Sequence, residues 1–264
     1  MEASGLLEGK RRLLLAPHGE LHYLPFAALI RRGTREQFLI ERYEVDYVPS
    51  ASVWARLSDR RAGPGAESIL ALAPLARTLP GSAAEVAAIA RIYGGRARVL
   101  AGADASERAL REAAGRAGIV HLATYGVLNK HNPLFSFVEL APEGADDGRL
   151  EVHEVFGLHL TARLVVLSAC QTALASGAIV DIPPGDDWVG LVRAFLFAGA
   201  RGVLATLWPV EDVATARLME RFYAALAAGR SETEAIAEAQ RSMLRNSETA
   251  HPFYWAGFAL VGGP

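Results

Sequence analysis

The sequence predicts an α/β fold in which a largely parallel central sheet is covered by helices on both faces. Between residues 68 and 261, short apolar runs alternate with helical patterns. The apolar runs lack polar alternation, as is typical of strands that are buried on both faces of a sheet. Because strands and helices take turns along the chain, we expect the sheet to lie between two layers of helices.

Six apolar runs are expected to form strands of this sheet. They cover residues 68–73, 97–100, 119–124, 163–168, 202–208 and 257–262. The intervening helices are predicted to begin at capping boxes, in which a side chain at each end of the first turn satisfies a backbone N–H group. The three candidate pairs are Ser82 with Glu85, Asp104 with Glu107, and Ser231 with Glu234.

Helix ends and helix faces are also visible in the pattern. Gly94 and Gly199 lie where helices are expected to stop, because glycine adopts the left-handed conformation that ends many helices. The helix after residue 211 has Leu218, Phe222 and Leu226 at a spacing of four, with Met219 and Tyr223 alongside. This spacing predicts a single apolar stripe that packs against the sheet.

The first 62 residues have a different pattern and are expected to be rich in β-structure. Strands and turns come first, followed by a short helix around residues 52–57. Residues 60–68, RRAGPGAES, are typical of a connector. We therefore expect an N-terminal subdomain over residues 1–62 that extends or flanks the main sheet, and an α/β subdomain over residues 63–264.

Composition indicates a soluble globular protein. The chain has 264 residues, of which 51% are hydrophobic and 21% are charged, with a net charge of -2. A near-neutral charge without a basic block argues against direct binding of nucleic acid. The single cysteine excludes an internal disulfide, which favours a reducing, cytoplasmic compartment. No signal peptide is apparent, and polar residues interrupt the longest charge-free run, 164–180, so no membrane span is expected.

Tyr125 and Cys170 are the residues that first suggest chemistry. Each is expected in a loop just past the carboxyl end of a strand, where reactive groups gather in open α/β sheets. If the two strands are neighbours, the two side chains face each other across a crevice. Two interpretations of Cys170 remain open: a buried, inert small hydrophobe, or a thiol whose pKa is lowered by nearby backbone N–H groups.

Several blocks of the sequence closely resemble the CHAT domain family, bacterial caspase-like domains related to separase and to clan CD cysteine peptidases. The blocks are HLATYG (121–126), LSACQTA (167–173), the long stretch 190–226, and HPFYWAGFALVG (251–262), with residues 17–30 and 41–54 resembling the family's N-terminal part. The resemblance covers almost the whole chain and implies a caspase-like sandwich. Cys170 follows position 125 by 45 residues and has Ala169 before it, which agrees with the spacing in caspases.

The resemblance also implies roles for individual residues. Cys170 corresponds to the family's nucleophile, and the N–H groups of Gly126 and Cys170 correspond to its oxyanion hole. The family's motif reads HLATHG in active members, and its second histidine, the catalytic base, is replaced here by Tyr125. Asp186 and Asp187 open a helix and are either simple caps or part of a substrate pocket, since an acidic group selects a basic residue in the separase branch.

None of the nearby residues is an obvious substitute for the missing base. A tyrosine with a pKa near 10 is a poor proton acceptor at neutral pH. His121 lies roughly 13 Å back along the strand, at ~3.3 Å per residue, and is expected to be a hydrogen-bonded core histidine. His131, in the following loop, has nothing in the sequence to favour it. Glu211 and Asp212 are expected to start a helix.

These observations predict a CHAT-fold protein with a cysteine endopeptidase-type site that is inactive or strongly impaired, acting as a protein-binding or regulatory module. The alternative is an active cysteine endopeptidase with Cys170 as nucleophile that cleaves a specific protein partner. A third interpretation is that Tyr125 was introduced to silence an active protein. The expected partners are a protein or peptide and, by resemblance, a helical-repeat sensor domain or adaptor.

No cofactor or metal is expected. Neither a Walker A pattern nor G-x-G-x-x-G occurs, and His251 has no second ligand at a usable spacing. Since CHAT domains usually follow helical repeat arrays, the chain is expected to be a single-domain member or a piece excised from a longer protein.

Overall fold

The computed structural model describes residues 5–31, 36–60, 65, 67–129, 132–171 and 187–263, and of residues 169–171 and 187–189 only the backbone. A ten-stranded sheet forms the centre, with its main path in the order β1-β4-β12-β11-β10-β7-β5-β6. Its pairs are parallel except those of β11 with β12, β7 with β8, and β8 with β9. The predicted α/β class with a largely parallel sheet is confirmed.

All six predicted strands are present in this sheet. They are β5 (Ile69–Ala73), β6 (Ala97–Ala101), β7 (Ile119–Val127), β10 (Leu164–Gln171), β11 (Gly202–Thr206) and β12 (Phe258–Gly262). The remaining strands of the sheet are β1 (Arg12–Leu15), β4 (Glu44–Tyr47), β8 (Phe137–Glu139) and β9 (Arg149–Glu151).

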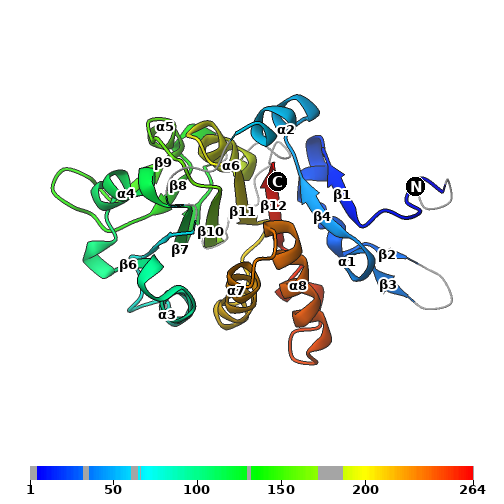
Figure 1. Cartoon of the computed structure of the whole chain (residues 1–264). Helices are drawn as coiled ribbons and strands as arrows, with labels where there is room; N and C mark the ends of the chain where they lie inside the picture. The colour runs from blue at the N-terminus through cyan, green and yellow to red at the C-terminus, as the bar shows by residue number, and fades with distance from the viewer. Residues whose placement is uncertain are drawn as a thin grey trace.

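Helices cover both faces of the sheet and form a sandwich (Figure 1). One face carries α2 (Ala51–Ser58), α4 (Glu107–Ala113), α5 (Val152–Val155) and α6 (Asp187–Phe197). The other face carries α1 (Leu39–Arg42), α3 (Pro80–Tyr93), α7 (Asp212–Ala227) and α8 (Glu232–Arg245). Each face therefore has its own apolar core.

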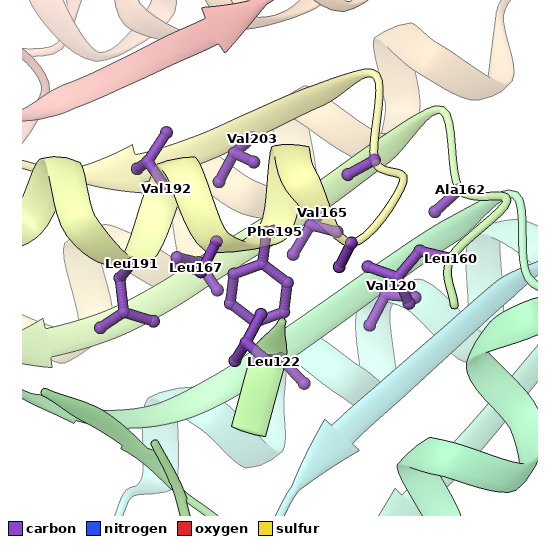
Figure 2. Close-up of a cluster of buried hydrophobic side chains, with 14 of the residues drawn as sticks. Val120, Leu122, Leu160, Ala162, Val165, Leu167, Leu191, Val192, Phe195 and Val203 are labelled. Atoms are coloured by element: carbon purple, nitrogen blue, oxygen red, sulfur yellow. The ribbon is translucent and has the colours of Figure 1, made fainter. Parts of the chain in front are cut away.

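Strand β7 supplies side chains to both cores in alternation. Val120 and Leu122 belong to the core under α6, whereas Ile119 and Ala123 belong to the core under α3 and α7. Figure 2 shows Phe195 of α6 reaching toward Leu122 across the first of these cores. Because successive strand residues point to opposite faces, the odd-numbered residues of β7 face α3 and α7.

Two of the three predicted capping boxes are wrong. Ser231 caps α8 in a box with Glu234 as expected. Helix α3, however, begins at Pro80, whose fixed backbone suits the first turn, so Ser82 lies inside the helix and its hydroxyl donates to the Leu79 carbonyl at 3.0 Å. Helix α4 is capped by Ser106, whose hydroxyl accepts from Ala109 N–H at 3.2 Å, rather than by Asp104.

The predicted helix ends and the predicted apolar stripe are confirmed. Gly94 caps α3 with a φ of 55°. Gly199 follows α6 with a φ of +124°, and a Cβ there would lie 2.1 Å from the carbonyl oxygen of Leu160, so only glycine fits. The stripe of α7 is buried, with Leu218, Met219, Phe222, Tyr223 and Leu226 all inside the core.

The N-terminal segment was expected either to extend or to flank the main sheet, and its strands extend the sheet. Strands β1 and β4 pair in parallel, and β4 joins β12 through Tyr47 opposite Val261. A separate hairpin is formed by β2 (Ile30–Arg31) and β3 (Gln37–Phe38). A division into subdomains at residue 62 stays a prediction. None of the helices in the described ranges is long and apolar enough to cross a membrane.

Candidate functional site

Tyr125 and Cys170 lie side by side on neighbouring strands. Strands β7 and β10 run parallel, and their register pairs Cys170 with Tyr125 and Gln171 with Gly126. The expectation that both residues lie in loops is wrong, because β7 continues to Val127 and β10 to Gln171. Strand β8 accounts for part of this extension, since it adds an antiparallel partner to Gly126 and Val127.

The register also places the pair on one face of the sheet. Residues that are opposite each other in a ladder share a face, and position 125 belongs to the face that α3 and α7 cover. Tyr125 is half-buried at the carboxyl edge of β7, while the neighbouring Gly126 is buried. Positions 125 and 170 are therefore adjacent at the carboxyl edge of the sheet.

Glu139 is a third residue of this edge and was not among the site residues predicted from the sequence. The antiparallel register of β7 and β8 pairs Gly126 with Val138, so its continuation by one residue brings Glu139 beside Tyr125. The Thr124 hydroxyl donates to the Glu139 carbonyl at 2.7 Å, which ties the two strands together at this point. The available signal was a single carboxylate inside the apolar run FSFVELAP (135–142).

His121 is a core histidine, as predicted. Its side chain is 0% exposed, its Nδ1 lies 2.8 Å from the Tyr223 hydroxyl, and its Nε2 lies 3.1 Å from Oε2 of Glu85, within ion-pair distance but not aligned as a hydrogen bond. Burial raises the pKa of Tyr223 well above its ordinary value, so this hydroxyl keeps its proton. Both ring nitrogens of His121 therefore face groups of the core rather than the sheet edge.

The other polar residues considered for the site either take part in helix starts or lie outside the residues that the structure describes. Asp187 is the first residue of α6, whereas Asp186 and His131 lie outside the described residues. Glu211 caps α7 by accepting from Ala214 N–H at 3.0 Å, and Asp212 accepts a hydrogen bond from Gly81 N–H. The expectation that Glu211 and Asp212 start a helix is confirmed.

The C-terminal block that contains His251 is structural. His251 caps a short 3-10 helix, Pro252–Tyr254, by accepting from Phe253 N–H at 3.2 Å. The block then leads into β12. Among the described residues there is no cluster of three or more His, Cys, Asp or Glu side chains arranged to hold a metal ion.

This fold and this arrangement of motifs define a known family. The CHAT domain model matches residues 3–263, and the chain therefore belongs to the CHAT domain family.

Two curated proteins are similar to this chain over almost its full length. They are Tetratricopeptide repeat protein 28 of Homo sapiens, 27% identical, and of Mus musculus, 28% identical, with 99% of this chain covered in both cases. The chain spans 12% of the length of these relatives.

Solved structures of low sequence identity share the fold. A chain of the Saccharomyces cerevisiae separase–securin complex covers 92% of this chain with a TM-score of 0.58 at 14% identity, the match spanning 15% of that chain. The Arg specific cysteine proteinase gingipain R covers 100% of this chain with a TM-score of 0.60 at 9% identity, over 66% of its own length. The caspase-like architecture is therefore shared with both.

Proposed function

We propose that this CHAT domain binds a protein or peptide segment at a peptidase-shaped site without cutting it efficiently, and that it acts as a binding or regulatory module. The observation that carries the proposal is the register of Cys170 with Tyr125. In this proposal Cys170 occupies the nucleophile position, Tyr125 occupies the position of the family's histidine base, and the N–H groups of Gly126 and Cys170 occupy the oxyanion hole.

The chemistry of a phenol supports impaired cleavage. A thiol needs a base to become the thiolate that attacks a peptide carbonyl, and a few per cent of an ordinary thiol is ionised at neutral pH. Tyrosine has an ordinary pKa of ~10, so it keeps its proton where histidine would accept one. Loss of one member of a cooperating catalytic unit typically lowers turnover by about 10⁴- to 10⁶-fold.

The surroundings of His121 support the same proposal. It is the histidine nearest in sequence to position 125 among the described residues, and it shares the face of Tyr125. Its two ring nitrogens lie against Tyr223 and Glu85, and its side chain has no exposed surface. His121 could therefore serve as the catalytic base only if its contacts with Tyr223 and Glu85 in the core were broken.

The relatives support a protein partner. The curated relatives are named for tetratricopeptide repeats, and one of the similar structures is a complex of separase with securin. We propose a protein or peptide partner for this chain too, together with a helical-repeat sensor domain or adaptor. Asp186 and Asp187 are proposed to contribute acidic groups to the binding site.

A second candidate function is a working cysteine endopeptidase. It is favoured by the presence of cysteine at position 170, in register with position 125 on the next strand. The similarity to the Arg specific cysteine proteinase gingipain R also favours a working endopeptidase. This candidate requires a base other than Tyr125 and His121.

A labelling experiment separates the two candidates. The unmodified protein, Tyr125→His and Cys170→Ala are incubated with a thiol-reactive peptide probe and with a peptide library, and labelling and cleavage rates are measured. We expect Tyr125→His to raise both rates by roughly 100-fold or more, the usual contribution of a general base, and Cys170→Ala to abolish labelling. Equal rates for the unmodified protein and Tyr125→His would overturn the proposal.

A further inference from the structure

A cavity of about 300 Å³ lies at the amino edge of the sheet, where β5 and β6 begin. It is enclosed by the first residues of these two strands, the end of α4 and the short 3-10 helix that follows α4 (Ala114–Arg116). Its lining includes Ser68, Leu70, Arg96, Arg98, Glu112 and Arg116.

This cavity is distant from the site at the carboxyl edge. Strands β5, β6 and β7 are parallel, and Ile69 lies opposite both Ala97 and Ile119 at their amino ends. Tyr125 follows Ile119 by six residues along β7, which at ~3.3 Å per residue separates the cavity from position 125 by roughly 20 Å along the strands. The lining of the cavity therefore takes no part in the arrangement around positions 125 and 170.

Arg98 lies on the face of the sheet that α4 covers. It is opposite Leu70 in the β5–β6 ladder, and Leu70 belongs to the core under α4 and α6. Residues that are opposite each other in a ladder share a face. Strand β6 is the last strand at this end of the sheet, and β5 is its strand partner within the described ranges (Figure 1). The cavity is therefore open to solvent beside β6.

Three arginine side chains face this cavity. Arg98 and Arg116 are exposed and form no ion pair with another described residue. Arg96 is oriented by two contacts, since its guanidinium lies 5.4 Å from the centre of the Tyr93 ring and 2.9 Å from a carboxylate oxygen of Glu67. An exposed ion pair of this kind is weak, so a doubly charged anion competes with Glu67 for Arg96.

The backbone around the arginines is fixed by hydrogen bonds and close packing. The Ser68 carbonyl accepts from Gly118 N–H at 3.1 Å and from Ile119 N–H at 2.9 Å. Gly65 has a φ of +86°, and a Cβ there would lie 2.4 Å from the carbonyl oxygen of Arg116, so the chain before β5 packs directly against the backbone of Arg116. A site that is held in place before binding loses little conformational entropy when a ligand binds.

The charge and size of the cavity match a doubly charged anion. Glu112 is the acidic residue among the described lining residues, so the three arginines leave an excess of two positive charges. A phosphate monoester carries a charge of about −1.5 to −2 at neutral pH, and guanidinium groups bind it through paired N–H donors. A carboxylate would neutralise half of this excess. The volume is at the lower end of the range of ligand pockets, about 300–1,000 Å³.

We propose that this cavity binds a phosphate monoester group, carried either by a small molecule or by a phosphorylated side chain of a protein. Arg98 and Arg116 supply the charge that no carboxylate of the described chain neutralises, and Arg96 supplies a third guanidinium.

Isothermal titration calorimetry with the full chain tests this site. The probes are free O-phosphoserine, a short glycine–alanine peptide that carries one phosphoserine, and the same peptide with an unmodified serine. We expect both phosphorylated probes to bind and the unmodified peptide to give no signal. A higher affinity for the phosphorylated peptide would identify a protein as the source of the phosphate, whereas an equal or lower affinity would identify a small molecule.

Substitutions in the lining are expected to change the affinity in both directions. Arg98→Ala and Arg116→Ala should each weaken the binding of O-phosphoserine roughly tenfold, the usual effect of losing a charged hydrogen bond. Glu112→Gln removes the opposing charge and should strengthen binding about threefold, a gain that a loss of folding would not produce. Arg245→Ala, a matched change at an exposed position of α8 outside the cavity, should keep the original affinity.

Thermal unfolding curves verify that each variant is folded. The proposal is refuted if neither phosphorylated probe binds the unmodified protein, or if Arg98→Ala and Arg245→Ala have the same effect on affinity. Because the cavity lies at the opposite edge of the sheet from positions 125 and 170, its refutation would leave the proposed function unchanged.

Discussion

Cys170 lies directly opposite Tyr125 in the parallel ladder between β10 and β7. The two residues that the sequence separates by 45 positions are therefore neighbours at one edge of the sheet. In the proposed function, this relationship makes position 125 the residue on which cleavage depends.

Removal of the tyrosine hydroxyl tests whether Tyr125 acts as a base. We expect Tyr125→Phe to label with a thiol-reactive peptide probe at the same rate as the unmodified protein, within about twofold, because a protonated phenol does not activate a thiol. The measurement is the rate of probe labelling at neutral pH. A loss of labelling in Tyr125→Phe would assign a catalytic role to the hydroxyl and contradict the proposal.

His121→Leu is expected to destabilise the fold by about 3 kcal/mol. The substitution leaves Glu85, which is 2% exposed, without the imidazole that faces it, and a buried polar group without a partner is costly. The free energy of unfolding is measured by urea titration. His159→Leu, the same change at an exposed histidine, is the matched control, and an equal effect of the two substitutions would argue against a structural role for His121.

Thr124→Val tests the side-chain hydrogen bond that links β7 to β8. The substitution keeps the shape of a side chain that is 1% exposed but removes the hydrogen bond to the Glu139 carbonyl, so we expect a loss of about 1 kcal/mol in the free energy of unfolding. Thr161→Val removes a similar bond, 2.9 Å to the Gly115 carbonyl, at an exposed position. Its effect in the same urea titration should be smaller, and the reverse order would contradict the assignment.

Asp46 gives the stability a defined dependence on pH. Burial raises the pKa of Asp46 above its ordinary 3.8, against the opposing effects of Arg12 and of the Thr233 hydroxyl at 2.9 Å. Between the ordinary and the raised pKa the folded state binds more protons than the unfolded state, so the contribution of this carboxyl to stability falls as pH rises.

The comparison with Asp46→Asn isolates this contribution. We expect the free energy of unfolding of the unmodified protein, minus that of the variant, to fall as pH rises from about 4 and then to become constant once Asp46 is ionised in both states. Urea titrations over this range provide the measurement. A difference that increases with pH would show that the pKa of Asp46 is lowered by Arg12 rather than raised by burial.

Much of the fold could be predicted because it depends on local patterns. The apolar runs locate six strands, and the spacing of Leu218, Phe222 and Leu226 identifies the buried face of α7. Helix starts were less predictable where more than one residue near the start of the helix could act as the N-cap. Pro80 and Ser106 begin α3 and α4 in place of the expected Ser82 and Asp104, since a cap depends on the backbone conformation that the neighbouring segment imposes.

The sequence by itself determined the class of fold and the two motifs around Tyr125 and Cys170, and from these motifs comes the prediction that a phenol occupies the family's base position. The tertiary structure alone decided that these positions are in register, that β7 and β10 continue past the predicted ends, and that Glu139 lies beside Tyr125. The physical reason is that a strand's ends and neighbours depend on hydrogen bonds with distant segments, such as β8 with Gly126 and Val127, whereas apolar periodicity is a property of each segment alone.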